Sequence, residues 1–572
     1  MNRRRFVKGV AAFGAASAFW RATAWGQTTT GAGPAILTGD RFDLTIGSIP
    51  VNITGRTRAA TVINGSMPGP SLSMREGDTV TINVTNRLRE PTSLHWHGIL
   101  LPNGMDGVPG LTFRGIMPGE TFTYRFPVRQ SGTYWYHSHS GDQEQTGMFG
   151  ALMIAPRDKE PYTYDREYVV TFSDWTDEDP MTILSNLKQQ SDYYDYQQRT
   201  LASFIQDAKA AGAGAALQDR LMWGEMRMSP TDIMDVTGAA YTFLINGNSP
   251  AANWTALFKP GEKIRLRFIN SAAMTTFDVR IPGLPLTVVA ADGSDVAPVV
   301  VGEFRIGVAE TYDVIVTPRD AAFTIFAQAE DRSGYARATL APRPGMTAAL
   351  PPMDPRPLRT MQDMGMGAGH MHGAAAAMTP KMAMAMAAAM MGSTANNADQ
   401  VNPMSLADNI NVDNMAMQPM SRLDEPGTGL EDNGRRVLVY SDLKSLKAHP
   451  VGGLNEYRDI IFHLTGNMQR FVWGFDGKKF SEAGPVRIKL GERIRFVLIN
   501  DTMMEHPVHL HGFIFSLENG QGDRLPLKHT VNVKPGERLS FVFDADTPGH
   551  WAFHCHLLYH MDAGMFRTVI VA

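Results

Sequence analysis

Three stretches of the chain repeat one pattern of alternating apolar and polar residues. They are GDTVTINVTN (Gly77–Asn86), GEKIRLRFIN (Gly261–Asn270) and GERIRFVLIN (Gly491–Asn500). Each begins with glycine and an acidic residue, continues with an apolar residue at every second position, and ends with asparagine. This period of two is typical of a β-strand with one buried face. A second element recurs as PGETFTYRF (Pro118–Phe126) and PGERLSFVF (Pro535–Phe543), so the pattern predicts related β-domains within one chain.

Many short strands separated by Gly- and Pro-containing turns favour an all-β fold of sandwiches or barrels. A chain of 572 residues also has room for more than one domain. We predict three β-domains, at residues 38–157, 165–345 and 434–572.

Two segments interrupt this plan. Residues 180–228 have apolar residues at helical spacing and are rich in helix formers, which predicts a helical insertion in the second domain. Residues 346–433 join the second domain to the third, and residues 353–420 within them hold 15 of the 34 methionines. This low-complexity composition predicts a Met-rich linker that is disordered or partly helical.

The first 24 residues have the layout of an export signal. A basic start, NRRRFVKG (Asn2–Gly9), precedes a weakly apolar stretch and the small residues Ala22–Ala24. The start matches the twin-arginine pattern R-R-x-F-x-K, so we predict export to the periplasm by that route, with residues 1–24 removed. Removing their five basic residues leaves 48 basic against 57 acidic residues, a net charge of −9, which argues against nucleic acid as a partner. No later stretch is long and apolar enough to predict a membrane span.

Ten of the 16 histidines fall in four clusters, and each cluster contains two histidines separated by one residue. Side chains two apart on a strand point the same way, so each pair aims two imidazoles at one place. Imidazole is a good ligand for Cu, Zn, Fe and Ni. The clusters are HWHG (His95, His97), HSH (His137, His139), HPVHLHG (His506, His509, His511) and HCHLLYH (His554, His556, His560).

The histidine pairs keep register with the repeated elements. Equivalent pairs of the first and last domains should therefore meet around one metal cluster enclosed between those domains. The spacing is nine residues from Asn86 to His95 and from Asn500 to His509, and eighteen from Gly119 to His137 and from Gly536 to His554.

The middle domain carries the same strand pattern without the histidines. Its corresponding positions hold apolar side chains that cannot bind a metal. We therefore expect this domain to have a structural and spacing role. The positions are Val279, Ile281, Ala327 and Ala329.

Cys555 is the only cysteine of the chain, so it forms no intramolecular disulfide. Between His554 and His556 on a strand, its side chain points away from both imidazoles, toward a second site. Together with His506, His560 and Met565 it matches a blue-copper centre of two imidazoles, one thiolate and a weak axial thioether. In the first domain only the methionine of this set has a counterpart. The equivalent positions there are Thr92, Ser138, Gln143 and Met148.

These motifs, in this order and spacing, resemble the multicopper oxidases over almost the whole mature chain. The twin-arginine signal, the segment MRMSPTDIMDVTG (Met226–Gly238) and the Met-rich linker make the chain similar to the bacterial copper-resistance (CopA-type) branch. The resemblance implies three cupredoxin-like Greek-key domains and four copper ions. It also implies one-electron oxidation of a substrate and four-electron reduction of O2 to water.

The resemblance further implies a role for each ligand. The type 1 copper takes His506, Cys555, His560 and Met565. The type 2 copper takes His95 and His509. The type 3 pair takes His97, His137, His139, His511, His554 and His556. Cys555 is then catalytic as well as a ligand, because its bonded neighbours belong to the other site.

Asp106 lies nine residues after His97, and the resemblance implies an acid there that assists O2 reduction. An aspartate that stabilises its own turn is the alternative. Two positions depart from the family. Met561 stands where many relatives have an acid, with Asp562 next, and His529 stands where an acid beside a type 1 histidine is common.

The Met-rich linker offers soft ligands for a copper substrate. Thioethers favour Cu(I), whereas packing of an apolar face is the alternative interpretation of such a stretch. Acids such as Glu505 offer hard ligands, although we expect them to be solvated on the surface. The candidate Cu(I) ligands are Met361, Met364, Met366, His370, Met371 and His372.

We predict a monomeric periplasmic oxidase that converts Cu(I) to Cu(II), with O2 as the acceptor, for copper resistance. A laccase-like oxidase of small phenols and a periplasmic copper-storage or delivery protein are the alternatives. Other copper-handling proteins of the periplasm are the expected protein partners.

Overall fold

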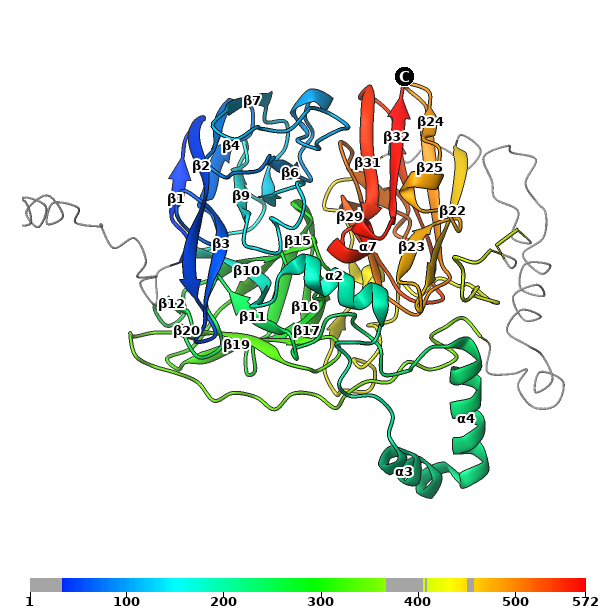
Figure 1. Cartoon of the computed structure of the whole chain (residues 1–572). Coiled ribbons are helices and arrows are strands. Elements are labelled where there is room, and N and C mark those ends of the chain that lie inside the picture. Colours follow the sequence, from blue (N-terminus) through cyan, green and yellow to red (C-terminus); the bar gives the residue numbers. More distant parts are fainter. Residues whose placement is uncertain (1–32, 367–404, 407–408, 450–456) are drawn as a thin grey trace, which may run out of the picture.

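The computed structural model describes residues 33–366, 405–406, 409–449 and 457–572. Within them the chain forms six sheets, grouped in three β-units that we call the first, middle and third units (Figure 1). The first unit (blue to cyan) and the third unit (orange to red) stand side by side above the middle unit (green). The all-β prediction is confirmed.

The first unit contains two sheets, with strand orders β1-β4-β9-β8-β6 and β3-β2-β5-β7. A short 3-10 helix, η1 (Asn103–Met105), follows β6. The strands are β1 (Ile36–Thr38), β2 (Arg41–Asn52), β3 (Thr57–Ile63), β4 (Ser71–Arg75), β5 (Thr79–Asn86), β6 (His95–His97), β7 (Thr121–Pro127), β8 (Gly132–His137) and β9 (Phe149–Ala155).

The middle unit has the sheet orders β11-β10-β13-β18-β15-β16 and β12-β20-β19-β14-β17-β21. The segment predicted to be helical forms three helices, α2 (Pro180–Gln189), α3 (Leu201–Ala211) and α4 (Ala213–Met226). The strands are β10 (Arg166–Thr176), β11 (Tyr241–Ile245), β12 (Thr255–Leu257), β13 (Ile264–Asn270), β14 (Phe277–Arg280), β15 (Leu286–Ala291), β16 (Ser294–Val301), β17 (Glu303–Ile306), β18 (Thr311–Val316), β19 (Phe323–Ala329), β20 (Tyr335–Ala341) and, beyond the linker, β21 (Val437–Leu438).

The third unit has the sheet orders β23-β22-β25-β30-β27-β28 and β24-β32-β31-β26-β29. Its strands are β22 (Arg458–Asn467), β23 (Val472–Phe475), β24 (Val486–Ile488), β25 (Arg493–Asn500), β26 (His506–Leu510), β27 (Phe515–Leu517), β28 (Leu527–Lys528), β29 (Thr530–Val533), β30 (Arg538–Asp544), β31 (Gly549–Cys555) and β32 (Phe566–Val571). The helices are α7 (Leu558–Asp562) and the 3-10 turns η3 (Tyr440–Asp442), η4 (Phe480–Glu482) and η5 (Gly522–Arg524).

The asparagine that ends each repeated strand has the same role in all three units. The amide of Asn86 donates to the carbonyls of Glu90 and Ile116 and accepts from the N–H of Leu88. Asn270 and Asn500 each make the same three kinds of bond. A side chain with donors and an acceptor can tie the strand end to the loop that follows, which explains why the repeat ends in this residue.

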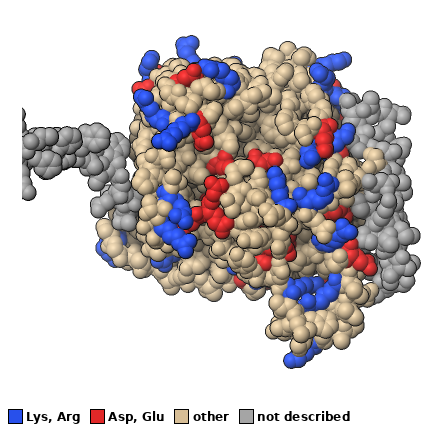
Figure 2. Space-filling view, in the orientation of Figure 1, with Lys and Arg blue, Asp and Glu red and all other residues tan. Residues whose placement is uncertain are grey.

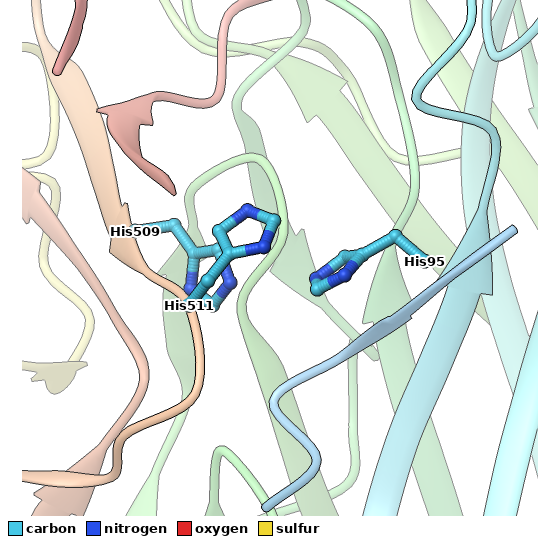
Figure 3. Close-up of side chains that lie close together, drawn as sticks. All are labelled: His95, His509 and His511. Atoms are coloured by element: carbon cyan, nitrogen blue, oxygen red, sulfur yellow. The ribbon is translucent and has the colours of Figure 1, made fainter. Parts of the chain in front are cut away.

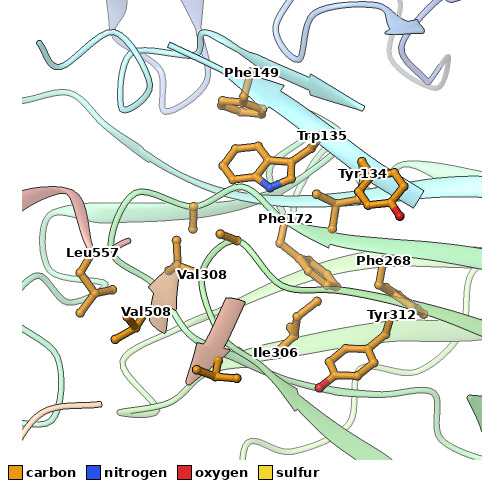
Figure 4. Packing of buried hydrophobic residues seen from close by; sticks show 14 of the residues in the cluster. Tyr134, Trp135, Phe149, Phe172, Phe268, Ile306, Val308, Tyr312, Val508 and Leu557 are labelled. Carbon is orange, nitrogen blue, oxygen red and sulfur yellow. The ribbon is translucent and has the colours of Figure 1, made fainter. Parts of the chain in front are cut away.

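Apolar side chains fill the junction of the three units. Figure 4 shows Trp135 and Phe149 of the first unit near Phe172 of the middle unit, with Val508 and Leu557 of the third unit beside them. All five side chains are buried. Continuous apolar packing between units favours a fixed arrangement over independent domains.

The described ends of the Met-rich linker are irregular in backbone but packed, rather than disordered. Met364 and Met415 are buried, and the N–H of Gln418 donates to the carbonyl of Gly365 at 3.0 Å. The two ends of the linker therefore meet at its base. Within the described part of the chain, no helix is long and apolar enough to cross a membrane. The predicted signal at residues 1–24 lies outside the described residues.

Candidate metal centres

Four strands bring the histidine pairs of the first and third units together. His95 in β6 is paired with His137 in β8, and His509 in β26 is paired with His554 in β31. The two units thus use the same register, as the spacing predicts. Figure 3 shows His95 facing His509 and His511 across the junction, and the rings of His95 and His511 lie 3.9 Å apart.

The middle unit keeps this register without the imidazoles. Val279 in β14 is paired with Ala327 in β19, at the place that the other two units give to histidine pairs. Both side chains are fully buried in the apolar core. The frame is therefore common to three units, and ligand side chains occur at this place in two of them.

Eight histidines of the first and third units converge, and we call them the imidazole cluster. Their ring nitrogens fit a set of bound metal ions. The eight are His95, His97, His137, His139, His509, His511, His554 and His556. Six of these nitrogens are buried and have no hydrogen-bond partner in the described residues, and those of His511 and His554 (Nε2 in each) face each other at 3.0 Å. Burial lowers the pKa of six of the rings well below 6.5, so they are neutral and keep their lone pairs. Converging neutral imidazoles are a ligand set for transition metals. The unpartnered atoms are Nε2 of His95, His137, His139, His509 and His556, and Nδ1 of His97.

Asp106 lies against this cluster, at the end of η1. Its carboxylate oxygens lie 3.0 Å from Nδ1 of His511 and 3.3 Å from Nδ1 of His95, and its backbone carbonyl lies 2.8 Å from the same atom of His95. Asp106 thus contacts one histidine from each unit, in addition to forming its turn. A carboxylate on Nδ1 fixes the tautomer and directs Nε2 to the metal side.

His529 lies beside the imidazole cluster, and the expectation that it stands beside a type 1 histidine is wrong. Its ring is 4.8 Å from that of His97, and its carbonyl lies 2.7 Å from Nδ1 of His509. The reason is strand pairing, since Thr530 in β29 is paired with His509 in β26. Asp292 of the middle unit accepts the N–H groups of His529 and Thr530, at 3.2 Å each, and so supports this segment.

A second group of ligands lies on the other face of β31. Sγ of Cys555 is 3.5 Å from Nδ1 of His506 and 3.8 Å from Nδ1 of His560. Met565 is fully buried, and its N–H donates to the carbonyl of His560 at 2.9 Å. Burial raises the pKa of the Cys555 thiol, so a thiolate here needs a bound cation. The group fits a soft transition-metal ion.

The far nitrogens of these two imidazoles are held by hydroxyl and carboxylate oxygens. Nε2 of His506 lies 2.7 Å from the hydroxyl of Thr502, and Nε2 of His560 lies 2.7 Å from Oδ2 of Asp235. Trp473 stacks on His560 with ring centroids 3.9 Å apart. Asp235 belongs to the middle unit. Its segment, Met226–Gly238, is one of the features on which the family resemblance rests, but no spacing in the sequence links Asp235 to His560.

A small cavity of about 10 Å³ adjoins Asp235. A cavity of that size holds one water-sized particle and no aromatic ring. Thioethers and carboxylates line it, which is a mixed soft and hard set. They come from Met234, Met274, Met504, Asp235, Glu330 and Glu505.

Glu505 is buried, so its expected position on the solvated surface is wrong. Its Oε1 lies 2.7 Å from Arg305, which in turn binds Asp278 and Glu330. The charges of Arg305 and Arg359 outweigh burial and lower the pKa of Glu505 to about 2. Arg305, a buried arginine of the middle unit, thus stabilises this acid in the interior. No local sequence pattern predicts that contact.

The linker candidates divide into two groups. Met364 is fully buried in the apolar core, while Met361 and Met366 are partly buried against it. That environment favours packing for these three side chains. His370, Met371 and His372 lie outside the described residues.

A larger cavity of about 1040 Å³ lies between the first and middle units and reaches His139. Acidic side chains contribute to its lining, and Figure 2 shows acids gathered near the middle of the face that carries α2. It offers water and small solutes a route to the imidazole cluster. Its acids are Glu90, Asp142, Asp177, Glu178 and Asp179.

Comparison with protein families and known proteins agrees with this arrangement. Three profiles, each described as multicopper oxidase, match residues 45–159, 166–345 and 454–572. The chain is 54% identical over 591 residues to a Copper resistance protein A homolog of Pseudomonas syringae pv. tomato, covering 100% of this chain and 99% of that one. It is 53% identical over 600 residues to Copper resistance protein A of Escherichia coli, with the same coverage.

Among solved structures, the multicopper oxidase Fet3p matches with a TM-score of 0.64 at 21% identity, covering 94% of this chain and 90% of that one, and shows the same fold.

Proposed function

Since the chain belongs to the multicopper oxidase family, and within it to the copper-resistance proteins, we propose that it oxidises Cu(I) to Cu(II) in the periplasm. Bound copper supplies the one-electron chemistry at the cysteine site and the four-electron reduction of O2 at the imidazole cluster. The family assignment favours an oxidase over a copper-storage protein. Export by the twin-arginine route is part of the proposal and rests on residues 1–24.

The ligand groups support four copper ions in the expected distribution. We propose that Cys555 and Met565, with two imidazoles, hold the type 1 ion, and that His95 and His509 hold the type 2 ion. The other six imidazoles of the cluster hold the type 3 pair. The ligands that complete these sets are His506 and His560 at type 1, and His97, His137, His139, His511, His554 and His556 at type 3.

The chain itself connects the two groups. Cys555 points to one site while its bonded neighbours His554 and His556 belong to the other, so a few covalent bonds separate them. Nδ1 of His554 also lies 2.9 Å from the carbonyl of Cys555. Such a short bonded route needs no diffusing carrier. Asp106 orients one histidine from each unit, and its place at the cluster supports a role in proton delivery during O2 reduction.

The cavity beside Asp235 is the observation that carries the choice of substrate. Three thioethers in its lining, those of Met234, Met274 and Met504, favour Cu(I). Asp235 also lines it and contacts Nε2 of His560, so a cation there is one side chain away from a proposed type 1 ligand. The small size of the cavity argues against a phenol at this place.

O2 consumption by the copper-loaded protein, with Cu(I) and with a phenol at matched driving force, tests the proposal. Met234→Leu conserves volume and removes one thioether, so we expect a higher KM for Cu(I) and little change for the phenol. Met153→Leu, at a buried methionine of the first unit, is the control. Equal losses on both substrates, or a preference for the phenol, would support the laccase-like alternative. No O2 uptake with either would support storage.

A further inference from the structure

Glu144 is a buried acid with no role in the ligand sets. It lies in the loop between β8 and β9 and is 4% exposed. Its Oε2 is 2.7 Å from Nδ1 of His137, and its Oε1 is 4.0 Å from Nδ1 of His556. His137 belongs to the first unit and His556 to the third. One carboxylate therefore spans the junction at which the two units meet.

A buried carboxylate is costly unless positive charge or hydrogen bonds compensate it. Within the described residues, both ion-pair partners of Glu144 are imidazoles, and its Oε1 has no hydrogen-bond partner. Nε2 of His137 and Nε2 of His556 are likewise buried and unpartnered. The site thus contains a buried acid without a Lys or Arg against it and two ligand atoms without partners. Cations held by those atoms would satisfy all three.

Asp106 provides an internal parallel. It contacts His95 of the first unit and His511 of the third unit, as Glu144 contacts His137 and His556. Each acid thus joins one histidine of each unit. Together the two acids contact four of the eight imidazoles.

We propose that Glu144 is a positioning residue and counter-charge for the type 3 copper pair. Its carboxylate holds Nδ1 of His137, so that Nε2 of that ring faces the metal, and its negative charge offsets the cations bound by His137 and His556. The inference rests on the proposed assignment of these two histidines. It does not depend on which substrate is oxidised.

Glu144→Gln keeps the shape and an acceptor for His137 and removes the charge. We expect the melting temperature of the copper-free protein to be unchanged or higher, because the cost of burying an acid without a cationic partner is gone. We expect the copper of the imidazole cluster to be lost to a chelator at about 10- to 100-fold lower concentration. The blue colour of the cysteine site should persist. Copper content per chain, visible absorbance and thermal unfolding measure these three effects.

Asp331→Asn is the matched control, since Asp331 is a buried acid whose Oδ1 accepts from the N–H and the hydroxyl of Ser333. For that purely structural acid, the copper-free melting temperature should fall while copper retention stays at the parent level. Glu144→Gln overturns the proposal if its copper retention equals that of the parent, or if the blue centre is lost together with the cluster. If retention changes as expected while Cu(I) oxidation is absent from the parent, the proposed function fails and the role of Glu144 stands.

Discussion

The first and third units carry the same loop after the same strand, yet only the third unit has the cysteine site. We call residues 137–148 together with Thr92 the first frame, and residues 554–565 together with His506 the third frame. In the first frame, the N–H of Ser138 donates to the carbonyl of Met148 at 3.1 Å, and in the third, Cys555 donates to Met565 at the same distance. The backbone geometry of the two frames is therefore alike.

The side chains of the first frame satisfy one another and leave nothing for a metal. The hydroxyls of Thr92 and Ser138 donate to the side-chain carbonyl of Gln143 at 2.6 and 2.9 Å. Thr92 also lies 3.4 Å from the sulfur of Met148. In the third frame, the equivalent positions are the converging sulfur and imidazole nitrogens. The comparison teaches that the fold supplies the frame, and three side chains decide whether it is a polar cluster or a redox site.

The largest expected effect follows from making the third frame like the first. Cys555→Ser removes the thiolate, so the blue colour and oxidation of any substrate should be lost completely. Visible absorbance and O2 consumption measure this loss. The reverse change, Ser138→Cys, should create no second blue centre, because Thr92 and Gln143 supply no imidazole. A second blue centre would show that a thiol alone converts the frame.

The next effect concerns the histidine pairs that the first and third units both contain. Asp106→Asn weakens the hold on His95 and His511, so we expect activity or cluster copper to fall about 10- to 100-fold. The blue colour should be retained, which separates the cluster from the cysteine site. Asp78→Asn, at an exposed turn aspartate of the first unit, is the control. If both variants behave alike, Asp106 is only a turn residue.

The repeated strands and the spacing of the histidines were enough to predict the fold and the meeting of the ligands. Period-two patterns and fixed turns are local, and a fixed spacing after the same asparagine must lead to the same register. The pairing of Val279 with Ala327 follows from this logic as well as the pairing of His95 with His137. The features that the sequence predicted are therefore those that depend on residue patterns within one unit.

The side chains that sequence could not predict reach the sites from another part of the fold. Asp235 and Asp292 come from the middle unit, and Glu144 reaches His556 across the junction. No spacing relates such residues, because their proximity depends on how the units pack. The wrong expectation for Glu505 has the same origin, since its arginine partner lies 200 positions away in the chain.

A smaller effect tests the polar cluster of the first frame. Thr92→Val removes a buried hydroxyl and keeps the shape, which should cost about 0.5–1.5 kcal/mol of stability. Blue absorbance and copper content should not change. Thr502→Val makes the parallel change in the third unit, beside Nε2 of His506, and should alter the blue absorbance. Thermal unfolding and visible spectra of the two variants compare the frames, and a spectral change in Thr92→Val would contradict their independence.

The smallest effect concerns a buried pair that only the third unit has. In the third unit His463 is paired with Ile499 and Leu464 with Asn500, the residue before Asp501. The first unit pairs Thr45 with Thr85 and Ile46 with Asn86 in the same register, so Thr45 is the counterpart of His463 and Arg87 that of Asp501. Nδ1 of His463 lies 2.7 Å from Oδ2 of Asp501. Burial lowers the pKa of His463, but the charge and hydrogen bond of Asp501 outweigh it and raise that pKa above 6.5.

Because the folded pKa of His463 is raised, its stabilisation is fully present below the unfolded pKa and is lost as pH rises through the folded pKa. The melting temperature of the copper-free parent, minus that of His463→Gln, should therefore be largest near pH 5.5 and smaller by about 1–3 °C at pH 8.5. Thermal unfolding across that range measures the difference. Thr45→Ser, at the equivalent place in the first unit, should give a difference that does not vary with pH. A difference that grows with pH would mean that the pair does not favour charged His463.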